Sequence, residues 1–213
     1  MAPTLKRRTG RPTTSVLSLE GIAEAALRLI DAVGFESMTM KSLASELGVA
    51  PSALYNHVPS KAALWLLVQE MLMGEVDVSV FQRLPLPSAM AAWARSYRDV
   101  FAAHPGVITG IAVLPVADSP RTLGVYEALA SALSAAGLPD ARIVSVIVAF
   151  ESFIFGSALD VTAPENIFDS GEDAGEHPVF ARAVAARAAL PADPADDAFE
   201  QGLAALLALL PAR

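Results

Sequence analysis

The chain has 213 residues and no cysteine, 54% of its residues are hydrophobic, and its net charge is −8. This composition predicts a folded chain with a large apolar core, built as one domain or as a small domain joined to a larger one. Without cysteine, disulfides, thiolate catalysis and thiolate metal sites are excluded, which favours a cytoplasmic protein.

Positive charge is concentrated at the N-terminal end. Residues 1–61 carry seven Lys and Arg against five acids, a balance of +2 that leaves −10 for the remainder. A basic end on an acidic body suits a protein that places one end on the phosphates of a nucleic acid. The alternative is that the acidic surface serves solubility and that the basic segment 1–17 is only a solvated tail.

The sequence shows neither a secretion signal nor a membrane anchor. Behind the basic start, Ser15, Ser18 and Glu20 interrupt any apolar stretch. The most apolar later stretch, 143–159, contains polar residues such as Glu151 and falls short of the roughly 18 uninterrupted apolar residues of a membrane helix. We therefore expect a buried helix of a protein with no membrane partner.

The first predicted helix runs from Ser18, as its N-cap, to Val33. Its apolar residues recur at three- and four-residue spacing, which indicates one face packed on a core. Gly34 then follows as a C-terminal stop.

Two shorter helices follow, at 40–47 and 51–58. Thr39 is a suitable N-cap for the first of them, Pro51 suits the first turn of the second, and Gly48 between them permits the left-handed backbone of a tight turn. Such a pair forms a helix-turn-helix, whose second helix enters the major groove of DNA. By periodicity alone, a three-helix packing unit with no DNA role would look much the same.

The remaining chain is predicted to be helical as well, with no strand alternation, so the fold class is all-α. A fourth helix extends from 62 toward Val80, and further helices are expected at 88–103, 105–114, 119–136, 140–161 and 195–210, bounded by Pro and Gly. The segment 162–177 is acidic, but its spacing does not match a calcium loop, so we predict a solvated loop and no metal site.

The run 39–61 resembles the DNA-binding segment of the TetR family of transcriptional regulators. The similarity rests on Leu-Gly-Val at 47–49, Leu-Tyr-Asn-His-Val at 54–58 and the closing Lys61. The resemblance implies a basic arm at 1–17, a helix-turn-helix domain at 18–61 and a helical ligand-binding and dimerisation domain at 62–213. Beyond Leu67 the likeness is to the tetracycline-repressor branch.

Roles in DNA binding follow from that resemblance and from side-chain chemistry. Lys41 and Lys61 resemble phosphate-contacting positions, and Tyr55 and His57 are further phosphate candidates. Asn56 is the best base-reading candidate, because its amide donates and accepts together as adenine requires. The DNA-facing set is predicted to be Lys41, Pro51, Ser52, Ala53, Tyr55, Asn56, His57 and Lys61.

The ligand-binding half is predicted from aromatic residues and from departures from the tetracycline-repressor pattern. The predicted lining is Trp93, Tyr97, Phe101, Ile111, Leu114, Phe150, Ser152 and Phe153. By that resemblance, Asp77, Ile111 and Ser152 stand where histidines are expected and Leu114 replaces a threonine, so tetracycline is an unsuitable effector and a more apolar molecule is expected. Glu151 and Asp160 are the polar groups of first interest, although the aromatic residues could equally be simple core.

The sequence thus predicts a repressor that binds a palindromic double-stranded DNA operator as a homodimer and is released by a small, largely apolar effector. Helices 140–161 and 197–210 resemble the family's dimerisation helices. The alternative is a regulator that acts as an activator or answers to a protein partner. Catalysis is not expected, because the histidines are isolated and neither a catalytic motif nor a cofactor-binding loop occurs.

Overall fold

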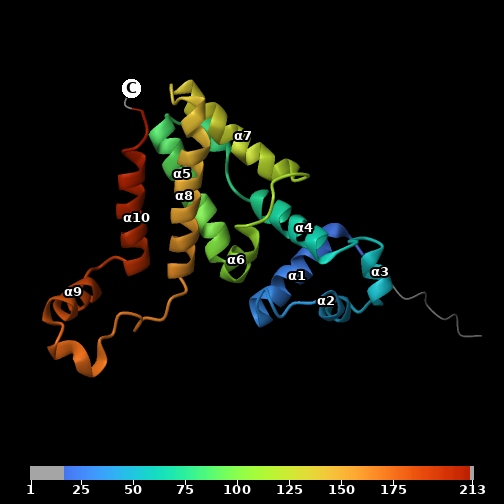
Figure 1. The fold of residues 1–213 in the computed structure, drawn as a ribbon, viewed down its shortest axis with the longest axis horizontal. Helices are drawn as coiled ribbons and strands as arrows, with labels where there is room; N and C mark the ends of the chain where they lie inside the picture. Colours follow the sequence, from blue (N-terminus) through green and yellow to red (C-terminus); the bar gives the residue numbers. More distant parts are fainter. Residues whose placement is uncertain (1–16, 212–213) are drawn as a thin grey trace, which may run out of the picture.

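The structure is a computed structural model that describes residues 17–211, and over that range it is helical with no strand (Figure 1). This confirms the predicted all-α class. The helices are α1 (Leu19–Val33), α2 (Met40–Glu46), α3 (Pro51–Tyr55), α4 (Lys61–Met73), α5 (Leu86–Ala102), α6 (Ile108–Ile111), α7 (Pro120–Ala135), α8 (Asp140–Asp160), α9 (Pro178–Ala188) and α10 (Pro194–Leu207), with 3-10 turns η1 (Ser79–Gln82), η2 (Pro105–Val107) and η3 (Gly171–Gly175).

Local hydrogen bonds fix the starts of the first two helices as the sequence predicts. The Ser18 hydroxyl accepts from the Gly21 amide at 3.1 Å and caps α1. At α2 the Thr39 hydroxyl accepts from the Ser42 amide while the Ser42 hydroxyl accepts from the Thr39 amide, both at 3.0 Å. This reciprocal pair satisfies two amide groups that a helix start leaves without intrahelical partners.

Several helices differ from the sequence-based expectation, and the one expected at 105–114 is divided into η2 and the short α6. Helix α3 ends at Tyr55 rather than at Val58, because the chain tightens into a turn before Pro59. Helix α4 stops at Met73, and Asp77 accepts from the Ser79 amide at 2.9 Å, which turns the chain into η1. Helix α9 was not expected, although Pro178 occupies the first turn as proline commonly does.

The C-terminal body is built around α5, α8 and α10, which pack side by side, while α4 connects α1 to α7 (Figure 1). Two ion pairs join α5 to α10: Arg95 binds Glu200 in a bidentate manner at 2.6 Å, and Arg98 binds Asp196 at 2.6 Å. Charge-assisted contacts of this geometry set the register of the two helices.

Helix α8 buries only one of its faces. The buried residues recur every three or four positions and are Ile143, Ile147, Phe150, Ile154 and Ala158. The opposite face is exposed, with Val144 at 69% and Val148 at 50%. By length and composition α8 is apolar enough to cross a membrane, and only 28% of its most apolar window is buried in the chain. The predicted buried helix is therefore covered on one side and open on the other.

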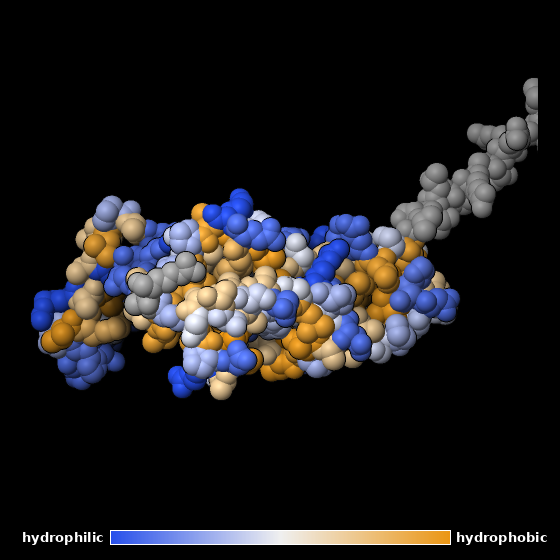
Figure 2. Space-filling view, turned by 90° about the horizontal axis from the view of Figure 1, so that it is seen from above, coloured by the Kyte–Doolittle hydropathy of each residue, from blue (hydrophilic) through white to orange (hydrophobic). Residues whose placement is uncertain are grey.

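A peripheral lobe, residues 161–193, extends from the end of α8 to the start of α10 (Figure 1). Neither η3 nor α9 contains a buried residue. Its apolar side chains are largely exposed, and hydrophobic atoms are visible at the corresponding end of the space-filling view (Figure 2). Within the described residues, no group of three or more His, Asp and Glu is arranged to hold a metal ion.

Candidate functional site

The first candidate site lies at the junction of α2 and α3. Gly48 has φ +66°, the left-handed conformation that the turn requires and that glycine adopts without a steric cost. The Val49 amide then donates to the Ala44 carbonyl at 3.0 Å. Ala44 and Leu54 are buried beneath the crossing, so the two helices hold each other in a fixed relative orientation.

The outer side of this pair carries the side chains that the sequence assigns to DNA. Leu54 and Val58 point into the core, which leaves the intervening residues on the outside. Exposed are Lys41, Pro51, Ser52, Tyr55, Asn56 and His57, while Ala53 is half-buried. Seven of the eight predicted residues are thus exposed or half-buried on α2, α3 and the turn that follows.

Lys61 has a different environment from the other predicted DNA-binding residues. Its side chain is half-buried, and its Nζ donates to the Met38 carbonyl at 2.7 Å. The same ammonium lies 5.3 Å from the ring centroid of Trp65 and 5.9 Å from that of Phe35. Lys61 therefore joins α4 to the segment before α2, a structural role that the sequence did not reveal. The basic arm at 1–17 falls, except for Leu17, outside the described residues.

A tight joint connects this N-terminal unit to the body. Gly110 of α6 lies flat against the Phe35 ring, and a Cβ added at Gly110 would overlap that ring. Phe35 in turn stacks on Trp65 of α4, with ring centroids 4.2 Å apart. Beside this stack, His104 Nδ1 and Asp31 Oδ2 are 2.8 Å apart and tie the end of α5 to α1. Any movement of α6 must therefore displace Phe35 or open this joint.

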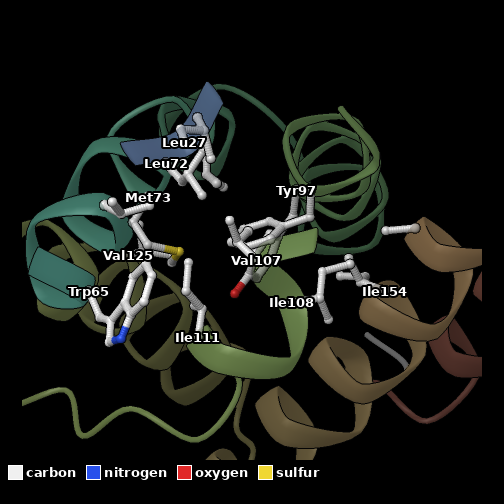
Figure 3. Close-up of a cluster of buried hydrophobic side chains, with 14 of the residues drawn as sticks. Leu27, Trp65, Leu72, Met73, Tyr97, Val107, Ile108, Ile111, Val125 and Ile154 are labelled. Atoms are coloured by element: carbon white, nitrogen blue, oxygen red, sulfur yellow. The ribbon is translucent and has the colours of Figure 1, made fainter. Parts of the chain in front are cut away.

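The second candidate site is a cavity of about 60 Å³ inside the body. Figure 3 shows Tyr97 of α5 extending toward Ile111 and Met73 in the surrounding apolar cluster. The lining comes from α4, α5, the segment 111–116, α7 and α8, and comprises Gln69, Met73, Tyr97, Ile111, Ala112, Leu114, Val116, Thr122, Tyr126, Glu151 and Phe155. The predicted residues Tyr97, Ile111 and Leu114, and the polar candidate Glu151, are therefore brought together.

The other predicted lining residues lie elsewhere. Trp93, Phe101 and Phe150 are fully buried core residues. Phe153 stacks on Phe199 of α10 at 5.5 Å, and Ser152 lies on the exposed face of α8. Helical spacing places residues on a face but does not distinguish a face that packs on a neighbour from one that borders a cavity.

Gln69, Thr122 and Tyr126 are lining residues that were not proposed from the sequence. Gln69 could have been predicted from the sequence, because it is a polar residue within the apolar run of α4 and on the buried side of that helix. The sequence did not indicate a role for Tyr126, because its phenol could have reached solvent. Asp160, the other polar candidate, lies at a separate hollow of about 650 Å³ between α8, the lobe and α10.

The main polar group of the cavity is the Glu151 carboxylate, which accepts hydrogen bonds from two tyrosine hydroxyls. Glu151 Oε1 accepts from the Tyr97 hydroxyl at 3.1 Å and from the Tyr126 hydroxyl at 2.9 Å. Burial raises the pKa of Glu151, and the two tyrosine hydrogen bonds oppose that rise. Burial and the Glu151 charge also raise the pKa of Tyr97 and of Tyr126, so both phenols remain donors.

A second carboxylate, that of Glu70, joins α4 to the start of α7. The Glu70 carboxylate accepts from the amides of Arg121 and Thr122 at 2.8 and 2.9 Å, and from the Thr122 hydroxyl at 2.8 Å. A negative side chain at these first-turn amides satisfies groups that have no helical partner. Gln69 Nε2 also donates to Thr122 Oγ1 at 3.1 Å, so one wall of the cavity is a joint between two helices.

Two family models match this architecture and together cover most of the chain. The model described as "Bacterial regulatory proteins, tetR family" matches residues 22–68, which include α2 and α3. The model described as "Tetracyclin repressor-like, C-terminal domain" matches residues 86–213, which include most of the cavity. The chain belongs to the TetR family. It is accordingly a DNA-binding transcription regulator with a C-terminal half of the ligand-binding type, as the sequence predicted.

Individual relatives agree with this assignment. The chain is 30% identical to the class A tetracycline repressor protein of Escherichia coli, across 87% of each chain. It is 27% identical over 71% of its length to the transcriptional repressor DrrR1 of Streptomyces coeruleorubidus, and that match spans a little over half of DrrR1, 56%. A Streptomyces coelicolor structure, the TetR family protein ActR in complex with (S)-DNPA, is 25% identical with a TM-score of 0.70, covering 90% of this chain and 96% of that one.

Proposed function

We propose that this TetR-family protein is a repressor that binds a palindromic operator as a homodimer and releases it when a small effector enters the cavity. Three features support the proposal: the exposed polar surface of α2 and α3, the open apolar face of α8, and a cavity wall that touches the DNA-binding end. The operator-binding domain is 18–61, and the effector and dimer domain is 62–213.

Operator recognition is assigned to the exposed surface of α3 and the turn after it. Asn56 reads a base edge, because its amide can donate and accept together. Tyr55, His57 and Lys41 contact phosphate and position the helix in the major groove. Pro51, Ser52 and Ala53 at the start of α3 complete the surface and can offer close apolar or hydroxyl contact to base edges.

Dimerisation is assigned to the outer faces of α8 and α10. On α8 the exposed positions Ala141, Ser145, Val148, Ser152 and Gly156 recur at three- and four-residue spacing, with Val144 beside them, and all but the two valines are small. On α10 the exposed positions include Ala204 and Ala205, and the exposed Ala208 follows as its C-cap. Small residues allow two helices to approach closely, and a continuous apolar face of this kind is unusual on a monomer. A two-fold axis through these helices would place the two α3 helices on successive turns of DNA.

The observation that carries ligand response is the position of α6. Ile111 borders the cavity, while the neighbouring Gly110 is in contact with Phe35 of the DNA-binding end. A ligand that presses on Ile111 therefore acts on a segment that has no freedom to move without disturbing Phe35 and Trp65. Because Lys61 at the start of α4 is held by the same two rings, the displacement reaches the base of the helix-turn-helix.

The effector is expected to have an apolar body, since Met73, Ile111, Leu114 and Phe155 line the cavity. Drug-sized ligands occupy roughly 300–1,000 Å³, so the cavity of about 60 Å³ must widen to accept one. The wall most able to yield is 111–119, which has no regular helix beyond Ile111 and contains Val113 at 80% exposure. Widening there would move α6, the element in contact with Phe35.

The direct test selects DNA fragments from a random pool with the purified protein. A two-fold symmetric consensus, bound by a dimer of this chain in a gel-shift titration, is the expected result. Selection of an asymmetric sequence, or of none, would contradict the proposal. Light scattering at micromolar concentration checks the dimer independently of DNA.

A further inference from the structure

The cavity presents hydrogen-bond acceptors, and its three hydroxyl groups already donate their protons to carboxylates of the protein. The hydroxyls of Tyr97 and Tyr126 both donate to Glu151 Oε1, and the Thr122 hydroxyl donates to Glu70. Within residues 17–211, Glu151 Oε2 receives no hydrogen bond from a protein group. One carboxylate oxygen at the cavity is therefore free to accept from a ligand.

A second acceptor is fixed by the Thr122 hydroxyl. The Thr122 hydroxyl donates its proton to Glu70, so it can only accept a hydrogen bond from Gln69. Gln69 therefore directs Nε2 toward Thr122, and its Oε1 faces the opposite way. Gln69 is 3% exposed, and its Oε1 has no partner among the described residues. A buried carbonyl without a donor costs roughly 1–3 kcal/mol until a ligand or water satisfies it.

The lining of the cavity, as residues 17–211 form it, supplies no positive charge to Glu151. None of the residues that line the cavity is Lys, Arg or His. Among the described residues, the hydrogen bonds to Glu151 come from two neutral phenols, which compensate a buried carboxylate less well than a cation does. Three aromatic rings, those of Tyr97, Tyr126 and Phe155, complete the lining, and aromatic faces attract cations as well as apolar groups.

We propose that the effector is a protonated amine on an apolar or aromatic body, with its N–H groups directed at Glu151 and Gln69. The inference rests on the proposed function of this cavity as the effector site and deepens it. The apolar walls hold the body of the molecule, and the two unused acceptors select its charge. A neutral or anionic analogue of the same shape leaves the carboxylate without a cation.

The test compares three probes that share a naphthylmethyl body, namely naphthylmethylamine, naphthylmethanol and naphthylacetate, titrated by naphthalene fluorescence and calorimetry at neutral pH. The amine is expected to bind at least about tenfold more tightly than the alcohol, and the acid more weakly than either, as for a charge-assisted contact in a partly dry site. An amine that binds no better than the alcohol, or the failure of all three to bind, would overturn the proposal.

Variants locate the effect at Glu151. Glu151→Gln keeps the side chain's shape and an acceptor for both tyrosines but removes the charge, so the preference for the amine should disappear while the alcohol binds within about twofold of before. Glu127→Gln is the matched control, an exposed acid on α7 next to Tyr126, and should keep the preference. A preference that survives in Glu151→Gln contradicts the assignment.

A second variant keeps the test decisive if Glu151→Gln does not fold. Tyr126→Phe removes one of the two donors from Glu151, so the carboxylate should depend more on the ligand and the ratio of amine to alcohol affinity should rise. An unchanged or smaller ratio would count against the proposal. Operator selection with the same preparation separates the hypotheses: if DNA is bound but the amine is not preferred, only the effector class is wrong.

Discussion

The DNA-binding end and the proposed effector cavity place their candidate side chains in opposite ways. The predicted DNA-facing residues come from one stretch, 41–61, and most are exposed. The cavity residues come from five segments between Gln69 and Phe155 and most are buried or half-buried. A surface that reads a polymer needs side chains in water and a rigid base, whereas a cavity needs several helices to meet around a space. Local sequence can supply the first, but only the packed body supplies the second.

The largest expected effect comes from disrupting the proposed dimer interface in the C-terminal body, which should weaken operator binding at the N-terminal end. Val148→Glu places a charge on the open face of α8, so the protein should become monomeric by light scattering at micromolar concentration. Operator affinity should then fall by at least about 100-fold, because each half-site would be bound without the other. Leu84→Glu, an exposed apolar residue outside α8 and α10, is the control and should remain dimeric. A dimeric Val148→Glu would remove α8 from the interface.

The next change acts on the joint between the two regions. Gly110→Ala pushes a methyl group into the Phe35 ring, so urea unfolding should show a loss of about 1–3 kcal/mol, the usual cost of overpacking. Gly124→Ala is the matched control, because a Cβ there meets nothing within 4 Å. It lies within α7 and should leave stability unchanged or slightly higher. Equal stability of the two variants would mean that α6 is not held against Phe35.

A substitution confined to the predicted base-contacting residue should change operator discrimination without affecting the C-terminal body. Asn56→Ala is expected to lower discrimination at one base pair by about tenfold, within the usual 1–3 kcal/mol of a bidentate contact. Asn166→Ala, an exposed asparagine in the peripheral lobe, serves as its control. Gel-shift titrations against single-base operator variants measure the effect. A uniform loss over all sequences would assign Asn56 to phosphate instead.

Substitutions of the two lysines predicted to contact phosphate, Lys41 and Lys61, should have different effects on stability. Lys41→Ala should reduce the dependence of operator affinity on salt by about one counterion, with no change in melting temperature. Lys61→Ala also removes the hydrogen bond to Met38 and the contacts with Phe35 and Trp65, so its melting temperature should fall as well. Equal melting temperatures would show that Lys61 has no structural role.

The smallest expected effect concerns the acid in the cavity. Because burial raises the pKa of Glu151 in the folded state, ionisation costs the folded chain more than the unfolded one, and stability is lost as pH rises through that raised pKa. Glu151→Gln should therefore melt about 2 °C or more above the parent at pH 8. The gap should narrow as pH falls toward the ordinary glutamate pKa near 4.3. A gap that does not vary with pH would point to packing instead of charge.

Sequence-based prediction was most successful where neighbouring residues decide the structure. The capped start of α2, the turn at Gly48 and the buried Ala44 are local features, and the structure contains each of them. In the body, Tyr97, Ile111 and Leu114 border the cavity, while Trp93, Phe101 and Phe150 are core. All six lie on the apolar faces of helices that the sequence predicts, so no local rule separates them.

By itself, the sequence determined the helical class, the helix-turn-helix and the exposed residues of α3, because capping, turn geometry and periodicity act within about a dozen residues. Only the tertiary structure decided that Lys61 is held by Met38 and two rings, and that Gly110 lies on Phe35. It also decided that Glu151 meets Tyr97 and Tyr126, which lie 54 and 25 residues away along the chain. Such contacts depend on how helices cross, which side-chain volume and packing across the whole body determine.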